Sequence, residues 1–239
     1  MGKSIVIIGG GPAGMMAACA AARQGKKDCQ IILVERRERP ARKLLITGKG
    51  RCNVCNDCAE PELIANVPRN GRFLYTAFTA FPPRAVMAFF EEAGVPLKVE
   101  RGNRVFPKSD RAVDVVDALT AAVKKAGVRM LEGRATGLLL EKLPAEEPSG
   151  GKKKAAPLTR VTGVELEDGR TLAADKILIA TGGLSYPATG STGDGYALAR
   201  AAGHGMAETA PSLVPLTVHE GWCAELQGLS LKNVGLKVL

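Results

Sequence analysis

A glycine-rich turn between an apolar run and a helix lies near the N-terminus of this 239-residue chain, and few folds accommodate it. The β-branched residues at 5–8 predict a buried parallel strand, which leads directly into GGGPAG at 9–14, a match to G-x-G-x-x-G. Residues 15–24 then predict a helix, and residues 30–34 predict a second buried strand that ends at Glu35. Elements in this order predict an α/β, Rossmann-like fold that binds a dinucleotide.

The residues of this turn have distinct tasks. Gly9 permits the tight turn, Gly11 lets the backbone approach a pyrophosphate, and Gly14 lets the helix pack closely against the strand. The helix N-terminus offers free N–H groups and the positive end of its dipole to the same pyrophosphate. The carboxylate of Glu35 would accept hydrogen bonds from ribose hydroxyls and would repel a 2′-phosphate. The site is therefore predicted to prefer FAD or NAD to NADP.

The segment after Glu35 distinguishes between these two cofactors. An NAD-binding domain would continue as a regular alternation of strands and helices. Residues 36–56 instead read RRERPARKLLITGKGRCNVCN, which is basic and has no clear strand or helix period. A long irregular excursion at this point is typical of FAD-binding domains, so the sequence favours FAD.

The middle of the chain predicts further helices and strands. Residues 71–93 are apolar and aromatic, and their aromatic stripe is predicted to belong to the core rather than to a binding platform. Two short strands are predicted around a tight hairpin at 101–103. A helix is predicted at 112–125, with Ser109 or Asp110 as its N-terminal cap.

A hairpin insertion is predicted at about 128–180, as in flavoproteins with two dinucleotide-binding domains. Its low-complexity stretch 141–159 predicts an exposed loop, so the Lys152–Lys154 run is interpreted as a solvated turn rather than a nucleic-acid patch. The insertion ends in ILIATGG, which predicts a buried strand at 176–180, followed by small residues where backbone meets cofactor.

Charge and hydropathy narrow the classes of partner. The chain has 33 lysine and arginine residues against 24 acidic residues, a formal net charge of +9, which favours anionic ligands such as nucleotide cofactors or nucleic acid. No apolar run reaches the ~18–20 residues of a membrane span, and the N-terminus lacks a cleavable signal pattern. We expect a cytoplasmic protein with a small-molecule substrate and with neither a membrane nor a nucleic-acid partner. The sequence does not predict its oligomeric state.

Cys52, Cys55 and Cys58 share C-x2-C-x2-C spacing, which is typical of iron–sulfur and other metal loops. Such a site needs four ligands, and the fourth would have to come from Cys29, Cys223, His204 or His219. The residues after Cys58 also lack the x3-C-P tail of ferredoxin-like loops. We therefore predict no metal site and interpret these cysteines as incidental to a cofactor loop, with a redox-active thiol pair near a flavin as the alternative.

Two longer segments carry a more specific signal than the glycine turn. ARKLLITGKGRCNVCN and ATGGLSYPATGSTGDGYALARAAGHGMAETAPSLVPL resemble the signature segments of one bacterial flavoprotein family, the BaiN-like or aminoacetone-oxidase-like NAD(P)/FAD-dependent oxidoreductases. The resemblance covers nearly the whole chain. It implies an FAD-binding domain of the two-dinucleotide-binding type at 1–210, and at 211–239 the incomplete beginning of an inserted, largely β second domain. The returning segment that completes the isoalloxazine pocket would be absent, so we expect a C-terminally truncated chain.

The same resemblance assigns site residues by motif. It implies that the pyrophosphate lies at the glycine turn, the adenine ribose at Glu35, and the flavin and phosphate side along 43–53. The residues expected to bind FAD are Gly9, Gly11, Pro12, Ala13, Gly14, Glu35, Arg36, Lys43, Leu44, Thr47, Gly48, Gly50, Arg51, Cys52, Asn53, Ala135, Thr181, Gly182, Gly183 and Asp194.

The activity that the family implies is an FAD-dependent oxidoreduction. NAD(P)H would reduce the flavin, which would pass hydride to a small organic acceptor such as a steroid-like enone; amine oxidation is another activity in the family. No catalytic side chain is assigned, and for Tyr186, His204 and His219, the candidates for a general acid, packing or surface roles are favoured. Two alternatives stay open, namely a non-catalytic FAD-binding fragment and an FAD-dependent tRNA-modifying protein, which the net charge of +9 suggests.

Overall fold

The structure is a computed structural model that describes residues 2–25, 29–143, 159–211, 218–231, 234–235 and 237. The chain divides into two compact units, Met1–Gly205 and Met206–Leu239. The first unit contains all three sheets. The predicted loop at 141–159 lies almost entirely outside the described residues, and the lysine run 152–154 lies wholly outside them.

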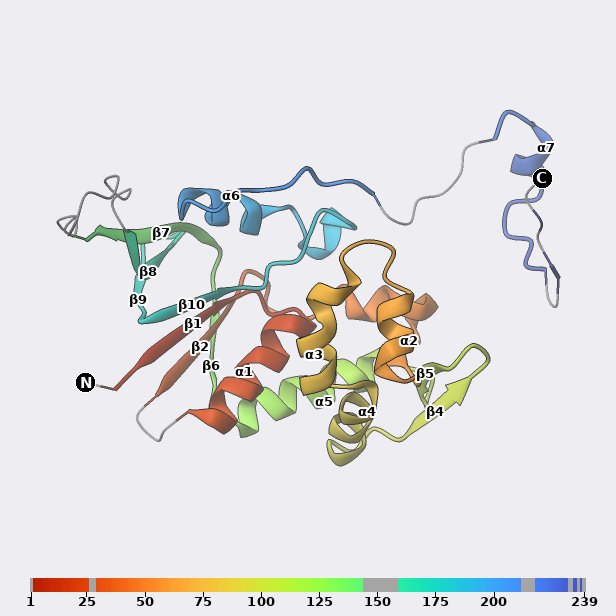
Figure 1. The fold of residues 1–239 in the computed structure, drawn as a ribbon, viewed down its shortest axis with the longest axis horizontal. Helices are drawn as coiled ribbons and strands as arrows, with labels where there is room; N and C mark the ends of the chain where they lie inside the picture. The colour runs from red at the N-terminus through yellow and green to blue at the C-terminus, as the bar shows by residue number, and fades with distance from the viewer. Residues whose placement is uncertain are drawn as a thin grey trace, which may run out of the picture. The chain divides into compact units, whose positions relative to one another are not determined.

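A four-stranded parallel sheet with the order β10-β1-β2-β6 forms the centre of the first unit (Figure 1). Its strands are β1 (Ser4–Ile8), β2 (Gln30–Glu35), β6 (Arg129–Glu132) and β10 (Lys176–Ile179). Chain order runs outward from β1 through β2 to β6 and then returns to the other side of β1 with β10. This reversal is the topological switch point of a Rossmann fold, and it confirms the predicted fold class.

One face of the parallel sheet is covered by two helices, α1 (Pro12–Gln24) and α5 (Ala112–Lys125). Ile7 of β1 and Leu33 of β2 pack in this core with Met15 of α1, and all three side chains are almost completely buried. The helix predicted from residue 15 begins at Pro12, because proline suits the first position of a helix, where no N–H bond is lost. The predicted bounds of α5 are confirmed.

The other face of the sheet is covered by an antiparallel sheet, β7-β8-β9, with strands Ala135–Lys142, Thr159–Leu166 and Thr171–Ala173. Val6 of β1 packs in this second core with Val164 of β8. Strands buried on both faces are expected to be continuously apolar, which explains why β1 and β2 show no alternation. The predicted insertion is therefore narrower than 128–180, since its ends, β6 and β10, belong to the parallel sheet.

A second antiparallel sheet has the order β3-β5-β4 and confirms the hairpin predicted at 101–103. Its strands are β3 (Cys55–Asn56), β4 (Leu97–Glu100) and β5 (Arg104–Pro107), and helix α4 (Pro83–Glu92) contacts it.

The predicted cap of α5 is wrong. The N-cap residue is Arg111, which makes no side-chain cap hydrogen bond. The carboxylate of Asp110 instead accepts hydrogen bonds from Lys98 at 2.6 Å and from Arg51 at 3.2 Å. Hydrogen bonds from two cations are stronger than one from a neutral backbone N–H. The carboxylate of Asp110 therefore binds Lys98 and Arg51 rather than the first turn of α5.

The prediction that the aromatic stripe at 71–93 lies in the core is only partly confirmed. Phe89 and Phe90 are buried and meet edge to face, with ring centroids 5.2 Å apart. Phe73 and Tyr75 are 86% and 60% exposed. Phe73 belongs to η2 (Gly71–Leu74), and Tyr75 begins α3 (Tyr75–Ala80). The helix before them is α2 (Glu60–Ala65).

The strand predicted as buried at 176–180 is β10, which lies at an edge of the parallel sheet, so Leu178 is 42% exposed. The remaining elements of the first unit are η1 (Leu44–Gly50), η3 (Pro187–Thr189) and α6 (Asp194–Ala201).

In the second unit, the described residues contain the short helix α7 (Trp222–Glu225) and no strand, so the largely β character predicted for 211–239 stays a prediction. Within the part of the chain that the structure describes, no helix is long and apolar enough to cross a membrane.

Candidate functional site

A cavity of about 310 Å³ opens at the carboxyl ends of β1, β2 and β10. Its wall includes Gly9 after β1, Glu35 at the end of β2, and Ala180 and Thr181 after β10. The cavity therefore lies where the strand order reverses, which is where open α/β sheets bind their ligands.

The glycine turn shapes one wall of this cavity. Gly9 has a φ of +113°, and a Cβ on it would lie 2.5 Å from the carbonyl oxygen of Ala180. A Cβ on Gly14 would overlap the carbonyl oxygen of Gly9, so the close packing of α1 on the turn requires glycine there. A Cβ on Gly11 would meet no atom within 4 Å, because that position faces open space.

The N-terminus of α1 is open to the cavity at the same point. Gly11 is its N-cap residue, no side chain caps the first turn, and the first turn carries no acid. The first N–H groups of a helix lack partners inside the helix and attract anions. A pyrophosphate fits this arrangement, since it would approach the backbone in the space that a side chain at Gly11 would fill.

Glu35 is fixed beside the turn by two backbone groups. One carboxylate oxygen accepts a hydrogen bond from the N–H of Gly10 at 2.7 Å, and the other accepts one from the N–H of Arg37 at 3.0 Å. A carboxylate oxygen can accept more than one hydrogen bond, so ribose hydroxyls can still bind Glu35.

A charged cluster of Arg36, Arg134 and Asp194 joins three segments at the cavity wall. One oxygen of Asp194 lies 3.3 Å from Arg36 and 3.1 Å from Arg134, and the other accepts a hydrogen bond from Thr192 at 2.8 Å. Partial burial would raise the pKa of Asp194, but the hydrogen bonds from Arg134 and Thr192, together with the charges of Arg134 and Arg36, outweigh this effect and hold that pKa below its ordinary value. Asp194 is therefore ionised at neutral pH.

Replacing Asp194 with asparagine is expected to lower the free energy of unfolding by about 1–3 kcal/mol, because it removes the charge that pairs with two arginines. Urea unfolding of the apo-protein would measure this. The matched control is Asp117→Asn, whose pair with Arg39 is exposed and 3.6 Å long, and which should change stability by less than about 0.5 kcal/mol. Equal losses in the two variants would contradict a structural role for the cluster.

The basic segment after β2 is bound to the glycine turn by its backbone. The N–H of Ala41 donates to the carbonyl oxygen of Gly10 at 2.9 Å, and Ala41 is buried with a φ of +55°. Lys43 donates to Ser185 at 3.2 Å. Arg42 and Lys43 both line the cavity.

The structure brings together about half of the residues predicted to bind FAD. The cavity wall includes Gly9, Gly11, Pro12, Ala13, Glu35, Arg36, Lys43, Ala135, Thr181, Gly182 and Asp194. The predicted residues outside this wall are Gly14, Leu44, Thr47, Gly48, Gly50, Arg51, Cys52, Asn53 and Gly183.

The cavity wall also includes residues that the sequence did not predict. The residues in this set are Ile8, Val34, Arg39, Ala41, Arg42, Gly133, Arg134, Ala180, Thr189, Gly190 and Ser191. The basic character of 36–43 could have indicated Arg39 and Arg42. No local signal indicated Arg134, which reaches the site because β6 pairs with β2 and ends two residues before it.

Arg51 has partners on the protein rather than in the cavity. Its guanidinium lies 2.9 Å from Glu100, 3.2 Å from Asp110, and 4.0 Å from the ring centre of Phe106. Lys98 completes the cluster, at 2.6 Å from Asp110 and 3.4 Å from Glu100. The predicted flavin-side loop is thus tied to β4 and β5.

This cluster predicts a loss of stability in acid. A hydrogen bond from Arg51 holds the pKa of Glu100 below its ordinary value, and one from Lys98 does the same for Asp110. Because both pKa values are lower in the folded state, the stabilisation is present above the unfolded pKa values of about 4 and is lost as pH falls below them. Urea midpoints between about pH 6 and pH 2 should fall less steeply in the Glu100→Gln/Asp110→Asn variant. Unchanged steepness would contradict the cluster's role.

The three cysteines of the loop are thiols at neutral pH. Cys52 is fully buried, and burial raises its pKa. Burial, together with the charge of Asp57 and the nearby Cys58, raises the pKa of Cys55 to about 11. Burial and the charges of neighbouring acids also raise the pKa of Cys58. Among the residues that the structure describes, no group of histidine, cysteine and acidic side chains could hold a metal ion.

Two of the candidates for a general acid, Tyr186 and His204, belong to the first unit and are absent from the cavity wall. The third, His219, belongs to the second unit. No catalytic side chain follows from the described residues.

A parallel sheet with a switch-point cavity, a glycine turn and an open helix N-terminus defines a Rossmann-type dinucleotide-binding domain. Within this class, the chain belongs to the HI0933-like family, since residues 3–239 match the family described as "HI0933-like protein Rossmann domain". This is an FAD-binding family, and the match confirms the flavoprotein resemblance drawn from the sequence motifs.

Curated relatives support the family assignment. The chain is 32% identical over 225 residues to the 3-dehydro-bile acid delta(4,6)-reductase of Clostridium scindens, covering 94% of this chain and 50% of the relative. It is 30% identical over 226 residues to the ribosomal RNA dihydrouridine synthase of Escherichia coli K12, again covering 94% and 50%. The chain thus spans about half the length of these relatives.

Solved structures show weaker likeness. The structure of THI4 from Thermovibrio ammonificans has a TM-score of 0.49 and 17% identity, over 75% of this chain and 56% of that one. The L-proline dehydrogenase of P. horikoshii has a TM-score of 0.45 and 15% identity, over 84% and 56%. Likeness at this level adds nothing to the family assignment.

Proposed function

We propose that this chain is the FAD-binding part of an oxidoreductase that takes reducing equivalents from NAD(P)H and passes them to an unsaturated carbonyl compound. The observation that carries the proposal is the uncapped N-terminus of α1, which opens with Gly11 onto the switch-point cavity beside Glu35. Backbone N–H groups, a carboxylate and a wall of small residues suit the diphosphate and ribose of a dinucleotide.

The residues of the cavity would divide the cofactor between them. The diphosphate would lie against Gly11 and the first turn of α1, and the adenosine ribose would bond to Glu35. Ala135, a small residue at the start of β7, leaves room for adenine. The bound flavin would supply hydride chemistry, while this chain's own residues bind and orient the cofactor.

The acceptor class follows from the names of two relatives. A delta(4,6)-reductase of a 3-dehydro bile acid and a dihydrouridine synthase both saturate a carbon–carbon double bond conjugated to a carbonyl group. Hydride adds to the far carbon of such a bond, and a proton then adds to the carbon next to the carbonyl. We extend this shared chemistry to the whole protein of which this family domain is a part.

The test begins with the 239-residue chain loaded with FAD under anaerobic conditions. Addition of NADH or NADPH should bleach the visible absorbance of the flavin, and addition of a cyclic enone should restore it with formation of the saturated ketone. Bleaching without reoxidation by the enone, in the whole protein as well as in this chain, would sink the acceptor class. Binding of FAD without bleaching by either donor would support the non-catalytic alternative.

A second candidate is an acceptor base within RNA. It is favoured by the two relatives named ribosomal RNA dihydrouridine synthase, from Escherichia coli and Haemophilus influenzae, and by the net charge of +9. Binding to a structured RNA should then weaken steeply as salt rises, because phosphate contacts release counterions. Absence of RNA binding at low salt would remove this candidate.

A further inference from the structure

Cations outnumber carboxylates on the cavity wall. The two carboxylates are Glu35 and Asp194, and the five cations are Arg36, Arg39, Arg42, Lys43 and Arg134. A concave site with excess positive charge attracts an anionic ligand, so the question is which of these cations is available to that ligand.

Four of the five cations already have partners on the protein. Arg36 and Arg134 share Asp194, and Arg39 pairs with Asp117. Lys43 donates to Ser185. Within the described part of the chain, the side chain of Arg42 makes neither an ion pair nor a hydrogen bond, and it is exposed to the cavity solvent.

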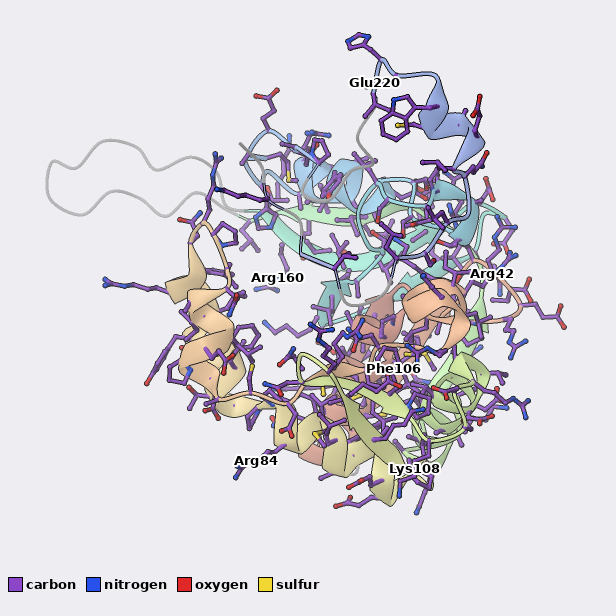
Figure 2. The ribbon with its side chains drawn as sticks, turned by 90° about the vertical axis from the view of Figure 1, so that its right-hand side faces the viewer. Arg42, Arg84, Phe106, Lys108, Arg160 and Glu220 are labelled. Carbon is purple, nitrogen blue, oxygen red and sulfur yellow. The ribbon has the colours of Figure 1, made fainter. Side chains whose placement is uncertain are left out.

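The backbone places Arg42 beside the glycine turn. Ala41, whose N–H donates to the carbonyl oxygen of Gly10, precedes it, and consecutive Cα atoms lie about 3.8 Å apart. Arg42, which is labelled in Figure 2, lies two residues before the start of η1. Ala41 holds a positive φ of 55° while buried, a conformation that costs energy in a non-glycine residue and is found mainly where the backbone serves a site.

We propose that Arg42, which lines the same cavity as the N-terminus of α1, binds the diphosphate of the dinucleotide. The helix end contributes only about half a positive charge, whereas each phosphate of the ligand carries a full negative one. A guanidinium offers parallel N–H groups that match phosphate oxygens, and it stays charged at any physiological pH. Arg42 thereby determines the preference of the site for diphosphate-bearing ligands. The inference rests on the proposed binding of FAD.

The test compares ligands with and without a diphosphate. FAD and ADP are titrated calorimetrically into the wild type and the Arg42→Gln, Arg42→Lys and Arg37→Gln variants, and adenosine is measured as a competitor of FAD. Arg37→Gln is the control, because Arg37 is exposed on the same segment but outside the cavity wall. Arg42→Gln should weaken FAD and ADP about tenfold or more, as expected for a charge-assisted hydrogen bond, and adenosine less than about twofold. Arg42→Lys should recover part of this loss.

Each outcome bears on a different claim. If Arg42→Gln binds FAD and ADP as well as Arg37→Gln does, the role of Arg42 is overturned. If it weakens adenosine as much as ADP, or unfolds at a lower urea concentration than the wild type, its effect is structural and the role is again overturned. If the folded wild type binds neither FAD nor ADP, the proposed function fails, and this inference fails with it.

Discussion

Replacing Gly11 with alanine is expected to abolish tight FAD binding while leaving the fold intact. The backbone of Gly11, with φ −75° and ψ 175°, is open to any residue, and the new Cβ would meet no protein atom within 4 Å. The free energy of unfolding should therefore change by less than about 0.5 kcal/mol. The methyl group would occupy the space of the diphosphate and separate it from the N–H groups of α1. Losing two charge-assisted hydrogen bonds corresponds to about 3 kcal/mol, or roughly a hundredfold in affinity.

Gly14→Ala is the matched comparison for this prediction. The same added methyl group would overlap the carbonyl oxygen of Gly9, so α1 must move away from the turn. We expect about 1–3 kcal/mol of destabilisation together with weaker binding. Calorimetric titration and urea unfolding of both variants separate the two effects. A Gly11→Ala variant that binds FAD normally would place the diphosphate elsewhere.

Phe106→Ala is expected to destabilise the protein by about 3–5 kcal/mol, which is typical for removal of a buried phenylalanine. Phe106, which is labelled in Figure 2, belongs to β5. Its side chain is 1% exposed, Arg51 lies over its ring, and a Cβ on Gly48 would meet it at 2.9 Å. Urea unfolding would measure the loss. Phe73→Ala, at a position that is 86% exposed, is the control and should cost less than about 0.5 kcal/mol.

The same pair of variants tests the role of the loop at 47–53. Because this loop packs on Phe106 and lies outside the cavity wall, FAD should bind the folded Phe106→Ala protein with affinity close to that of the wild type. The affinity is measured without urea, under conditions where the variant is folded. A large loss of affinity would show that this loop contributes to the cofactor site, as its sequence motif indicates.

The first strand, glycine turn, helix and second strand were predictable because each depends on local signals. The hydrophobic period, the glycine spacing and the acid at Glu35 all lie within one short segment of the sequence. Each element forms close to its predicted position. The switch-point cavity then follows from topology, since the fourth parallel strand, β10, returns beside β1.

Several residues have partners far away in the sequence that local patterns could not predict. Arg51 suited a phosphate loop, but Glu100 and Asp110, brought close by the β4–β5 hairpin, hold it in the structure. The position of Asp110 predicts a helix cap, but its carboxylate accepts a stronger hydrogen bond from Lys98. Arg134 belongs to the site without any motif, because β6, which ends just before it, pairs with β2. Local sequence patterns do not show which strands pair, and strand pairing brings these distant side chains together.

Binding of FAD to the 239-residue chain tests the central claim most directly. Calorimetric titration of the folded apo-protein with FAD should give one site per chain, and the protein should keep its yellow colour after desalting. A chain that is folded by circular dichroism, stays colourless after incubation with FAD and releases no heat in the titration would contradict the assignment of the cavity as the cofactor site.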